Sequence, residues 1–283
     1  MRVWLSPFLA CMFLAGCSSD GTVRKNPFRD QERVIEKLSA EQLYKSGRAS
    51  LDSGDNASAL DFYQRLDARY PFTPYATQGQ LETIYAHHRA FGTELALTAA
   101  ARFIKQHPRH AAIDYVYYLR GLIYQSQIEE GFEELLGVDS TRRSPDAARQ
   151  AFDAFGLLIQ RYPTSRYSSE SRQRMVYLRG ILARYELNIA EYYLRRRAYV
   201  ASSRRAQLVL DKYQGTPSVA RALDVLRESY AELGLKDLAT NADKMLRYNF
   251  PKYDGQGKTP FLRWPFGKKK DASAQTPPAL KAS

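Results

Sequence analysis

The sequence has few of the residues that build metal sites and nucleophilic active sites. Among its 283 residues there are two cysteines and four histidines, at Cys11, Cys17, His87, His88, His107 and His110. His87 and His88 are neighbours, so they point to different faces of a helix and do not form the i, i+4 pair that binds a metal. No glycine-rich phosphate loop and no Gly-x-Ser-x-Gly nucleophile turn occurs. We therefore expect no enzyme activity, no metal site and no bound cofactor.

Strand-forming patterns are also scarce, whereas helical patterns are common. No stretch shows the alternation of β-branched and polar residues that is typical of a half-buried strand. Hydrophobic residues make up 44% of the chain, with 20 Tyr and 13 Phe. They recur at helical spacing, as in the stripe of Ala59, Phe62, Tyr63, Leu66 and Tyr70. These features predict an all-α protein.

Acidic residues are outnumbered by basic ones. The chain has 42 Lys and Arg against 30 Asp and Glu, which gives a net charge of +12. A basic balance favours nucleic acid, an anionic membrane or an acidic protein as the partner. Composition does not choose among these three, but the N-terminus does.

The first sixteen residues have the build of a secretory signal peptide. A single basic residue, Arg2, precedes an apolar run over 3–15 that is too short to cross a bilayer. The run leads into Leu14-Ala15-Gly16-Cys17, which resembles the bacterial lipobox, where cleavage precedes a lipid-modified cysteine. We expect residues 1–16 to be removed, and Cys17 to carry a diacylglycerol on its sulfur and an acyl chain on its amine. The alternative is an ordinary signal with a chance cysteine.

This anchor decides among the partners. Ser18 stands where an aspartate often retains lipoproteins in the inner membrane, so we expect the protein in the outer membrane, lipid-anchored and facing the periplasm. Nucleic acid is not a partner there. Removal of Arg2 leaves a mature charge of 12 − 1 = +11. The lipid blocks Cys17, the one cysteine left, so we expect no disulfide.

An aromatic residue, usually followed by proline, recurs along the chain and divides it into repeats. The pattern is clearest over Arg69–Tyr75 and returns at His107, Tyr162, Tyr213 and Phe250. Proline ends a helix because it has no N–H to donate and pushes the preceding residue out of the α region. The intervals from position 70 are 37, 55, 51 and 37 residues, and the shorter ones approach the roughly 34-residue tetratricopeptide period. The alternative is that such pairs merely end unrelated helices.

These repeats predict the domain organisation. Residues 33–253 are expected to form a superhelix of five tetratricopeptide-like helical hairpins, with small residues such as Gly47 where paired helices cross closely. Residues 17–32 read as a lipidated tether, and 254–283 as a disordered basic tail. Within that tail, Phe261–Lys270 combines aromatic and basic residues. It suits a membrane surface or a partner, or is simply a solubilising stretch.

Two groups of side chains suggest protein binding. Aromatic residues of the first three repeats suit an extended peptide, because tyrosine combines a large contact area with a polar tip. They are Tyr70, Phe72, Tyr75, Tyr85, Tyr115 and Tyr118. For any single one of them, packing in the core is the competing interpretation. The basic cluster over Arg195–Arg205 suits an acidic partner, or is a solvated face.

Several longer phrases of the sequence carry a resemblance to a known family. They are Arg69-Tyr70-Pro71-Phe72, Pro74-Tyr75, Ile113-Asp114-Tyr115-Val116, Arg120-Gly121-Leu122, Gly137-Val138-Asp139 and Ala190-Glu191-Tyr192-Tyr193. Together with the lipobox and the repeats, they make the chain resemble the BamD family, the tetratricopeptide-repeat lipoproteins of the outer-membrane β-barrel assembly (BAM) complex. The resemblance covers about residues 30–250. The fourth repeat departs from the usual pattern, with Ser202 and Gln214 where Ala and Pro are common.

The resemblance implies a non-enzymatic scaffold that supports insertion of β-barrel proteins into the outer membrane. It implies binding of the POTRA domains of BamA, the central barrel subunit, through the C-terminal repeats, and contact with other Bam lipoproteins. It also implies that the N-terminal repeats receive unfolded outer-membrane proteins. The residues that it assigns are Tyr70, Phe72, Tyr75 and Tyr115 for precursors, and Arg197, Arg204 and Arg205 for BamA.

Two other functions stay open at this point. One is a tetratricopeptide envelope lipoprotein that scaffolds cell-wall synthesis, against which the phrases around Ile113 and Ala190 argue. The other is a lipid-anchored hydrolase, against which the lack of any nucleophile–base arrangement argues.

Overall fold

The structure, a computed structural model, describes residues 35–129, 145–255, 277 and 278. These residues form ten α-helices and no strand, which confirms the predicted all-α class. The predicted signal peptide, Cys17 and the tether lie outside the described residues, as do the Gly137-Val138-Asp139 phrase and the Phe261–Lys270 stretch. Residues up to Ser39 belong to a unit separate from the one that begins at Ala40, and the helices described below all belong to the second unit.

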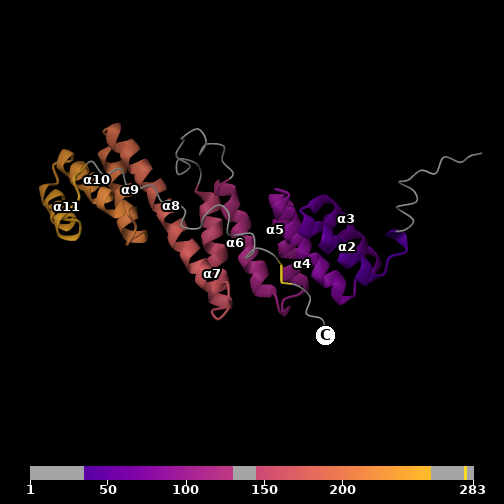
Figure 1. The fold of residues 1–283 in the computed structure, drawn as a ribbon. Coiled ribbons are helices and arrows are strands. Elements are labelled where there is room, and N and C mark those ends of the chain that lie inside the picture. Colours follow the sequence, from indigo (N-terminus) through magenta and orange to yellow (C-terminus); the bar gives the residue numbers. More distant parts are fainter. Residues whose placement is uncertain (1–34, 130–144, 256–276, 279–283) are drawn as a thin grey trace, which may run out of the picture. The chain divides into compact units, whose positions relative to one another are not determined.

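The helices pair into five successive hairpins, as the repeat pattern predicts (Figure 1). The pairs are α2 Ala40–Ser53 with α3 Asn56–Arg69, α4 Pro74–Arg89 with α5 Thr93–Gln106, α6 Ile113–Glu129 with α7 Asp146–Arg161, α8 Ser168–Arg195 with α9 Tyr199–Lys212, and α10 Ser218–Glu232 with α11 Lys236–Asn249. Each helix packs against the next one along the chain. Such nearest-neighbour packing is the rule in repeat proteins, whose core is built hairpin by hairpin.

Each hairpin ends at the aromatic residue that predicted its boundary. The C-caps of the second helices are Tyr70, His107, Tyr162, Tyr213 and Phe250. In every case the cap N–H donates to the carbonyl four residues earlier, and the backbone then leaves the helix at φ between −134° and −124°. All five rings are half-buried. Because all five hairpins share this cap geometry, an aromatic residue ends the fourth hairpin at Tyr213 even though no proline follows it.

Helix α6 is apolar on two faces and buries both of them. Tyr115 and Tyr118 lie on one face and Val116 and Tyr117 on another, and each of these four side chains is at most 3% exposed. The helix packs against α5 and α7, and also touches α4. A helix that is hydrophobic all round must be enclosed in this way. The two-faced pattern is therefore a mark of the core at this position.

Close helix crossing in the third hairpin depends on Gly121. A Cβ atom at this position would lie 2.4 Å from Cε1 of Phe155, a ring that is fully buried on α7. We expect Gly121→Ala to lower the free energy of unfolding by about 1–3 kcal/mol, because the ring or the helix has to move in a packed core. Urea or thermal unfolding followed by circular dichroism measures this loss.

Gly156 on α7 provides a matched control. A Cβ atom there would meet Met175 Cε at 3.5 Å, an ordinary contact. Gly156→Ala is therefore expected to leave stability unchanged or to raise it by up to about 1 kcal/mol, through the better helix propensity of alanine. Equal losses from the two substitutions would show that the crossing at Gly121 is not unusually tight.

Ser202, which stands where the repeat pattern usually has alanine, has a structural role. The Ser202 hydroxyl lies 3.0 Å from the carbonyl of Ala190 on the preceding helix, and 3.1 Å from the hydroxyl of Ser229 on the following one. Ser202 and Ser229 are both fully buried. The hydroxyl thus links α8, α9 and α10 where alanine would only fill space.

Two residues of the predicted disordered tail are held against the repeats. Pro277 is buried, and the Pro278 carbonyl accepts a hydrogen bond from Gln78 Nε2 at 2.7 Å. Within the range 254–283 predicted as the tail, Asp254 and Gly255 are described as well. Consecutive prolines have little backbone freedom to lose, so burial and one hydrogen bond offset the cost of ordering them.

Candidate protein-binding surfaces

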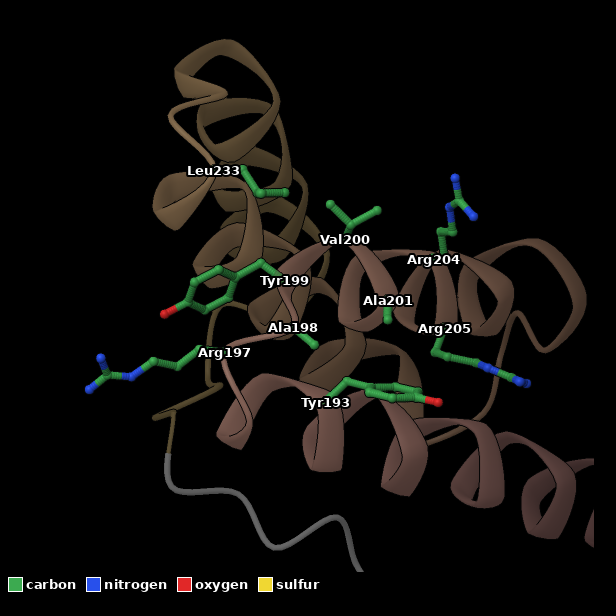
Figure 2. Close-up of a pocket in the computed structure, with 9 residues that line it drawn as sticks. All are labelled: Tyr193, Arg197, Ala198, Tyr199, Val200, Ala201, Arg204, Arg205 and Leu233. Carbon is green, nitrogen blue, oxygen red and sulfur yellow. The ribbon is translucent and has the colours of Figure 1, made fainter.

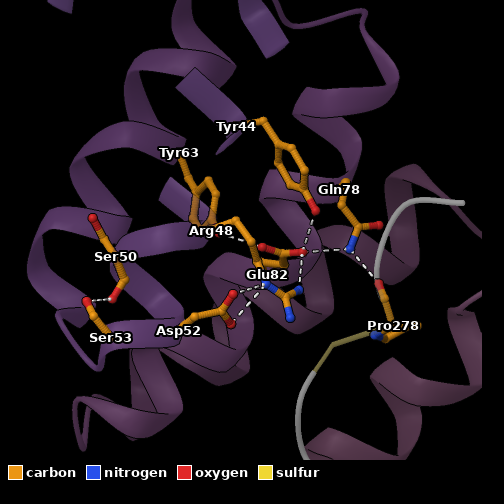
Figure 3. Close-up of polar contacts among 9 residues, drawn as sticks. All are labelled: Tyr44, Arg48, Ser50, Asp52, Ser53, Tyr63, Gln78, Glu82 and Pro278. Atoms are coloured by element: carbon orange, nitrogen blue, oxygen red, sulfur yellow. Dashed lines mark hydrogen bonds and ion pairs between the residues drawn. The ribbon is translucent and has the colours of Figure 1, made fainter. Parts of the chain in front are cut away.

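A fully buried carboxylate, Glu82, joins the helices of the first two hairpins (Figure 3). From α2, Tyr44 Oη donates to Glu82 Oε1 at 3.0 Å and Arg48 Nη1 pairs with the same oxygen at 3.0 Å. From α3, Tyr63 Oη donates to Oε2 at 2.5 Å. Gln78, one turn earlier on α4, donates to Oε1 at 2.9 Å. We call these five residues the Glu82 network.

The charges of the network are balanced. Burial, with the nearby Glu82 charge, raises the pKa of the Tyr44 and Tyr63 hydroxyls above their ordinary value, so both stay protonated and act as donors. Burial by itself disfavours the charge on Arg48, but Glu82 and Asp52 more than compensate and raise its pKa. The network therefore holds one negative and one positive charge with their hydrogen bonds satisfied, which is the condition for a stable buried ion pair.

Three of the four residues predicted to contact precursors gather where α3 turns into α4. Tyr70 caps α3, Phe72 lies in the turn, and Tyr75 is in the first turn of α4. The Phe72 side chain is 99% exposed, and Tyr70 and Tyr75 are half-buried. The Tyr75 ring centroid lies 5.8 Å from that of Tyr44, so this aromatic turn adjoins the Glu82 network. We use "aromatic turn" below for Tyr70, Phe72 and Tyr75.

The fourth residue, Tyr115, does not join them. It lies on α6 with no exposed surface, and its ring packs 5.7 Å from that of Tyr167. Burial raises the pKa of its hydroxyl well above the ordinary value. The assignment of Tyr115 to precursor contact is corrected here, because a side chain enclosed by neighbouring helices offers no surface to a ligand.

The three arginines predicted to bind a partner surround one hollow between the fourth and fifth hairpins (Figure 2). We call it the arginine hollow. It measures about 590 Å³ and is lined by Tyr193, Arg197, Ala198, Tyr199, Val200, Ala201, Arg204, Arg205 and Leu233. The guanidinium groups point in different directions around an apolar floor, and Val200 is 53% exposed. A floor of this kind with a basic rim is suited to an acidic protein surface.

The three arginines are not equivalent. Arg205 Nη1 pairs with Glu186 Oε2 at 2.7 Å, and Arg149 Nη2 approaches the other oxygen of the same buried carboxylate at 3.7 Å. Among the described residues, no ion pair joins Arg197 or Arg204 to a carboxylate. Arg205 therefore has a structural task as well, while Arg204 is the clearest candidate for an external partner.

Nothing in the described part of the chain resembles a metal centre. It contains no group of three or more His, Cys, Asp or Glu residues that could hold a metal ion. His107 and His110 pack around Phe103, with ring centroids 4.9 and 5.3 Å from it. Burial lowers the pKa of His88 to about 4, so this side chain is neutral near pH 7. The histidines of the described chain thus read as packing residues.

Sequence reasoning missed the polar residues of the Glu82 network and the proline pair of the tail. Gln78 and Glu82 do carry a signal. They lie four residues apart on a helix that must be buried on more than one side, and Glu82 stands between the apolar Leu81 and Ile84. Nothing in the sequence links them to Pro278, which lies 200 residues away.

Comparison with known proteins gives one family. The model of the YfiO family, described as outer membrane lipoprotein, matches residues 36–246. That range runs from before α2 into α11 and so includes all five hairpins. Within the part of the chain that the structure describes, no helix is long and apolar enough to cross a membrane.

Three similar curated proteins bear the name outer membrane protein assembly factor BamD. The protein of Neisseria meningitidis serogroup A is 36% identical over 249 residues, which cover 88% of this chain and 89% of that protein. The protein of Vibrio cholerae is 34% identical, covering 87% of this chain and 97% of its own length. That of Xylella fastidiosa is 36% identical and covers 81% and 77%. The matches thus extend over most of both chains.

Proposed function

The chain belongs to the YfiO family of outer membrane lipoproteins, and from this membership we propose that it is an outer membrane protein assembly factor, a BamD-type subunit of the BAM complex. The observation that carries the proposal is the match over all five hairpins with relatives that bear this name. Its role there is accessory, and we infer that it is a non-enzymatic scaffold. None of the relatives described above favours the alternative role in cell-wall synthesis.

We propose that the protein is held at the outer membrane by lipid on Cys17 and faces the periplasm. The Leu14-Ala15-Gly16-Cys17 sequence supports this, and so does the family's description as outer membrane lipoproteins. A diacylglycerol on the sulfur and a third chain on the amine make such anchoring effectively stable, since each buried CH₂ contributes about 0.8 kcal/mol.

We infer that the arginine hollow receives the main partner, the POTRA domains of a BamA-type barrel protein. Arg197 and Arg204 supply positive charge at its rim, while Tyr193, Val200 and Leu233 supply apolar surface. The aromatic turn is the proposed contact for unfolded outer-membrane proteins, since a fully exposed Phe72 beside two half-buried tyrosines offers an apolar surface to an extended chain. Contact with other Bam lipoproteins is part of the same proposal.

A pull-down tests the function as a whole. The tagged full chain is isolated in mild detergent at low and at high salt, and the bound proteins are identified by mass spectrometry. We expect a BamA-type barrel protein together with Bam lipoproteins. Cell-wall enzymes in their place would overturn the proposal and support the scaffold for cell-wall synthesis.

A charge reversal at Arg204 tests whether the arginine hollow binds the POTRA domains. Arg204→Glu is expected to weaken binding of the purified POTRA domains about tenfold at low salt, which is about 1.4 kcal/mol, because it places like charge against an acidic partner. The difference is expected to shrink at high salt, where surface charges are screened. Surface plasmon resonance at two ionic strengths measures both effects.

Lys45→Glu makes the same change of charge on an exposed side chain of α2, in the first hairpin. It is expected to leave binding of the POTRA domains within about twofold of the original chain, because it lies outside the hollow. Equal weakening by Lys45→Glu and Arg204→Glu would mean that overall charge matters and the hollow does not.

A further inference from the structure

The proline pair near the C-terminus lies in a polar site on α4. Gln78 Nε2 donates to the Pro278 carbonyl at 2.7 Å (Figure 3). The preceding residue, Pro277, is buried. This contact joins residues 200 positions apart. It lies at the edge of the Glu82 network, whose five residues all belong to the first two hairpins.

The donor in this contact is held in place by the network. A glutamine amide has two N–H donors. The Gln78 nitrogen gives one of them to Glu82 Oε1, at 2.9 Å, and Glu82 is itself fixed by Tyr44, Tyr63 and Arg48. The second N–H is thereby aimed at the position where the Pro278 carbonyl lies. Gln78 is only 5% exposed, so its side chain has little freedom to turn away. A donor oriented before binding lowers the cost of capturing a backbone carbonyl.

The occupant has a matching chemistry. Pro277 precedes another proline, which restricts its backbone to extended or polyproline II conformations. Such a segment loses little entropy on binding and presents its carbonyls outward. Polyproline segments are commonly received by surfaces lined with aromatic side chains. Tyr75 lies three residues before Gln78 on α4, and its ring centroid is 5.8 Å from that of Tyr44, whose hydroxyl donates to Glu82.

We propose that the face of α4 at Gln78 is a receptor site for an extended, proline-containing peptide segment, and that the chain's own Pro277–Pro278 occupies it in cis. Pro277 lies 22 positions after Gly255 (277 − 255 = 22), and a connection of this length gives the tethered segment an effective concentration in the millimolar range. Any external segment that binds at this face must displace the tail. This inference goes beyond the proposed function and does not depend on it.

A labelled peptide with the sequence of residues 271–283 tests the site on the full chain. The tail is first released by Pro277→Asp with Pro278→Asp, two changes outside the helices. Fluorescence anisotropy then measures peptide binding to the released and the original chain. If the peptide binds with a dissociation constant of about 0.1 mM and the tethered tail acts at about 1 mM, the original chain is expected to bind about tenfold more weakly. Binding of equal strength by both chains would overturn occupancy in cis.

The donor is tested in the released chain. Gln78→Met keeps the length of the side chain and removes both N–H donors, so it is expected to weaken peptide binding at least fivefold. The matched control is Gln207→Met, because Gln207 makes the same i, i+4 hydrogen bond to Asp211 at 2.9 Å on the exposed side of α9. The control is expected to bind the peptide as the released chain does. An equal effect of both substitutions would contradict the assignment of the donor.

The peptide itself provides a test that leaves the protein unchanged. A version with both prolines replaced by alanine is expected to bind the released chain at least fivefold more weakly than the native peptide. Equal binding of the two versions would refute recognition of the proline pair. Failure of the native peptide to bind the released chain below about 1 mM would refute the receptor site, because the tethered tail could not then fill it. None of these outcomes bears on whether the protein joins the assembly machinery.

Discussion

Replacement of Glu82 by alanine is expected to lower the free energy of opening of the first two hairpins by about 3–5 kcal/mol. It removes the buried carboxylate that pairs with Arg48, leaving this guanidinium only the more exposed Asp52, and it removes the acceptor of two buried tyrosine hydroxyls. Hydrogen exchange of the amides in α2–α4 measures the loss. Amides of α10 and α11 are expected to be unaffected, because in a repeat array each hairpin depends on its neighbours only.

Two further substitutions separate the role of the buried charge at Glu82 from the general cost of removing a carboxylate. Glu82→Gln keeps the shape and loses the charge, so it is expected to cost less than Glu82→Ala. Glu41→Ala removes a carboxylate that is half-exposed and pairs with exposed Lys45 at 2.7 Å, and is expected to cost about 0.5 kcal/mol or less. A loss for Glu82→Ala as small as that for Glu41→Ala would show that the buried network contributes little to stability.

Replacement of Cys17 by alanine is expected to remove the protein from the outer-membrane fraction almost completely, since no acyl chain can then be attached. The repeats are expected to keep their helical circular dichroism, because the cysteine precedes the first repeat helix, α2, by 23 positions (40 − 17 = 23). Flotation of membranes in a density gradient, followed by immunoblotting, measures the distribution. The physical basis is the loss of roughly 0.8 kcal/mol for every CH₂ that the lipid buries.

Cys11→Ala is the natural control for the anchor. Cys11 lies within the segment expected to be removed, so this change is expected to leave the protein in the outer membrane. The flotation is best done in cells depleted of the barrel subunit, so that protein contacts do not hold the variant at the membrane. A Cys17→Ala protein that still floats with outer membranes in those cells would rule out the lipid anchor.

Much of the fold follows from local features of the chain. The aromatic residues at 70, 107, 162, 213 and 250 predicted the ends of five hairpins, and each is a C-cap in the structure. Asp55, a residue type favoured at helix starts, is the N-cap of α3, and its carboxylate accepts from the Ser58 N–H at 3.0 Å. Such signals are readable because a cap or a turn depends on residues within a few positions of one another.

The binding surfaces were predictable only in part, because exposure depends on what other helices cover. Phe72 and Tyr115 belong to the same aromatic set in the sequence, yet one is 99% exposed and the other fully buried. Tyr115 lies on a helix that three others enclose, whereas Phe72 lies in a turn. The arginines at 204 and 205 are adjacent, and the pairing of Arg205 with Glu186 follows from the packing of α9 on α8.

The local sequence thus decided that the chain is helical, where each hairpin ends and in which order the hairpins follow, through hydrophobic periodicity and helix caps. The tertiary structure alone decided which polar side chains meet in the interior, as at Glu82, and which face of α4 the proline pair reaches. The physical reason is that a buried hydrogen bond requires its donor and acceptor to converge from different helices. The spacing of residues along one helix defines a face, but the partner of that face is determined by how the hairpins stack.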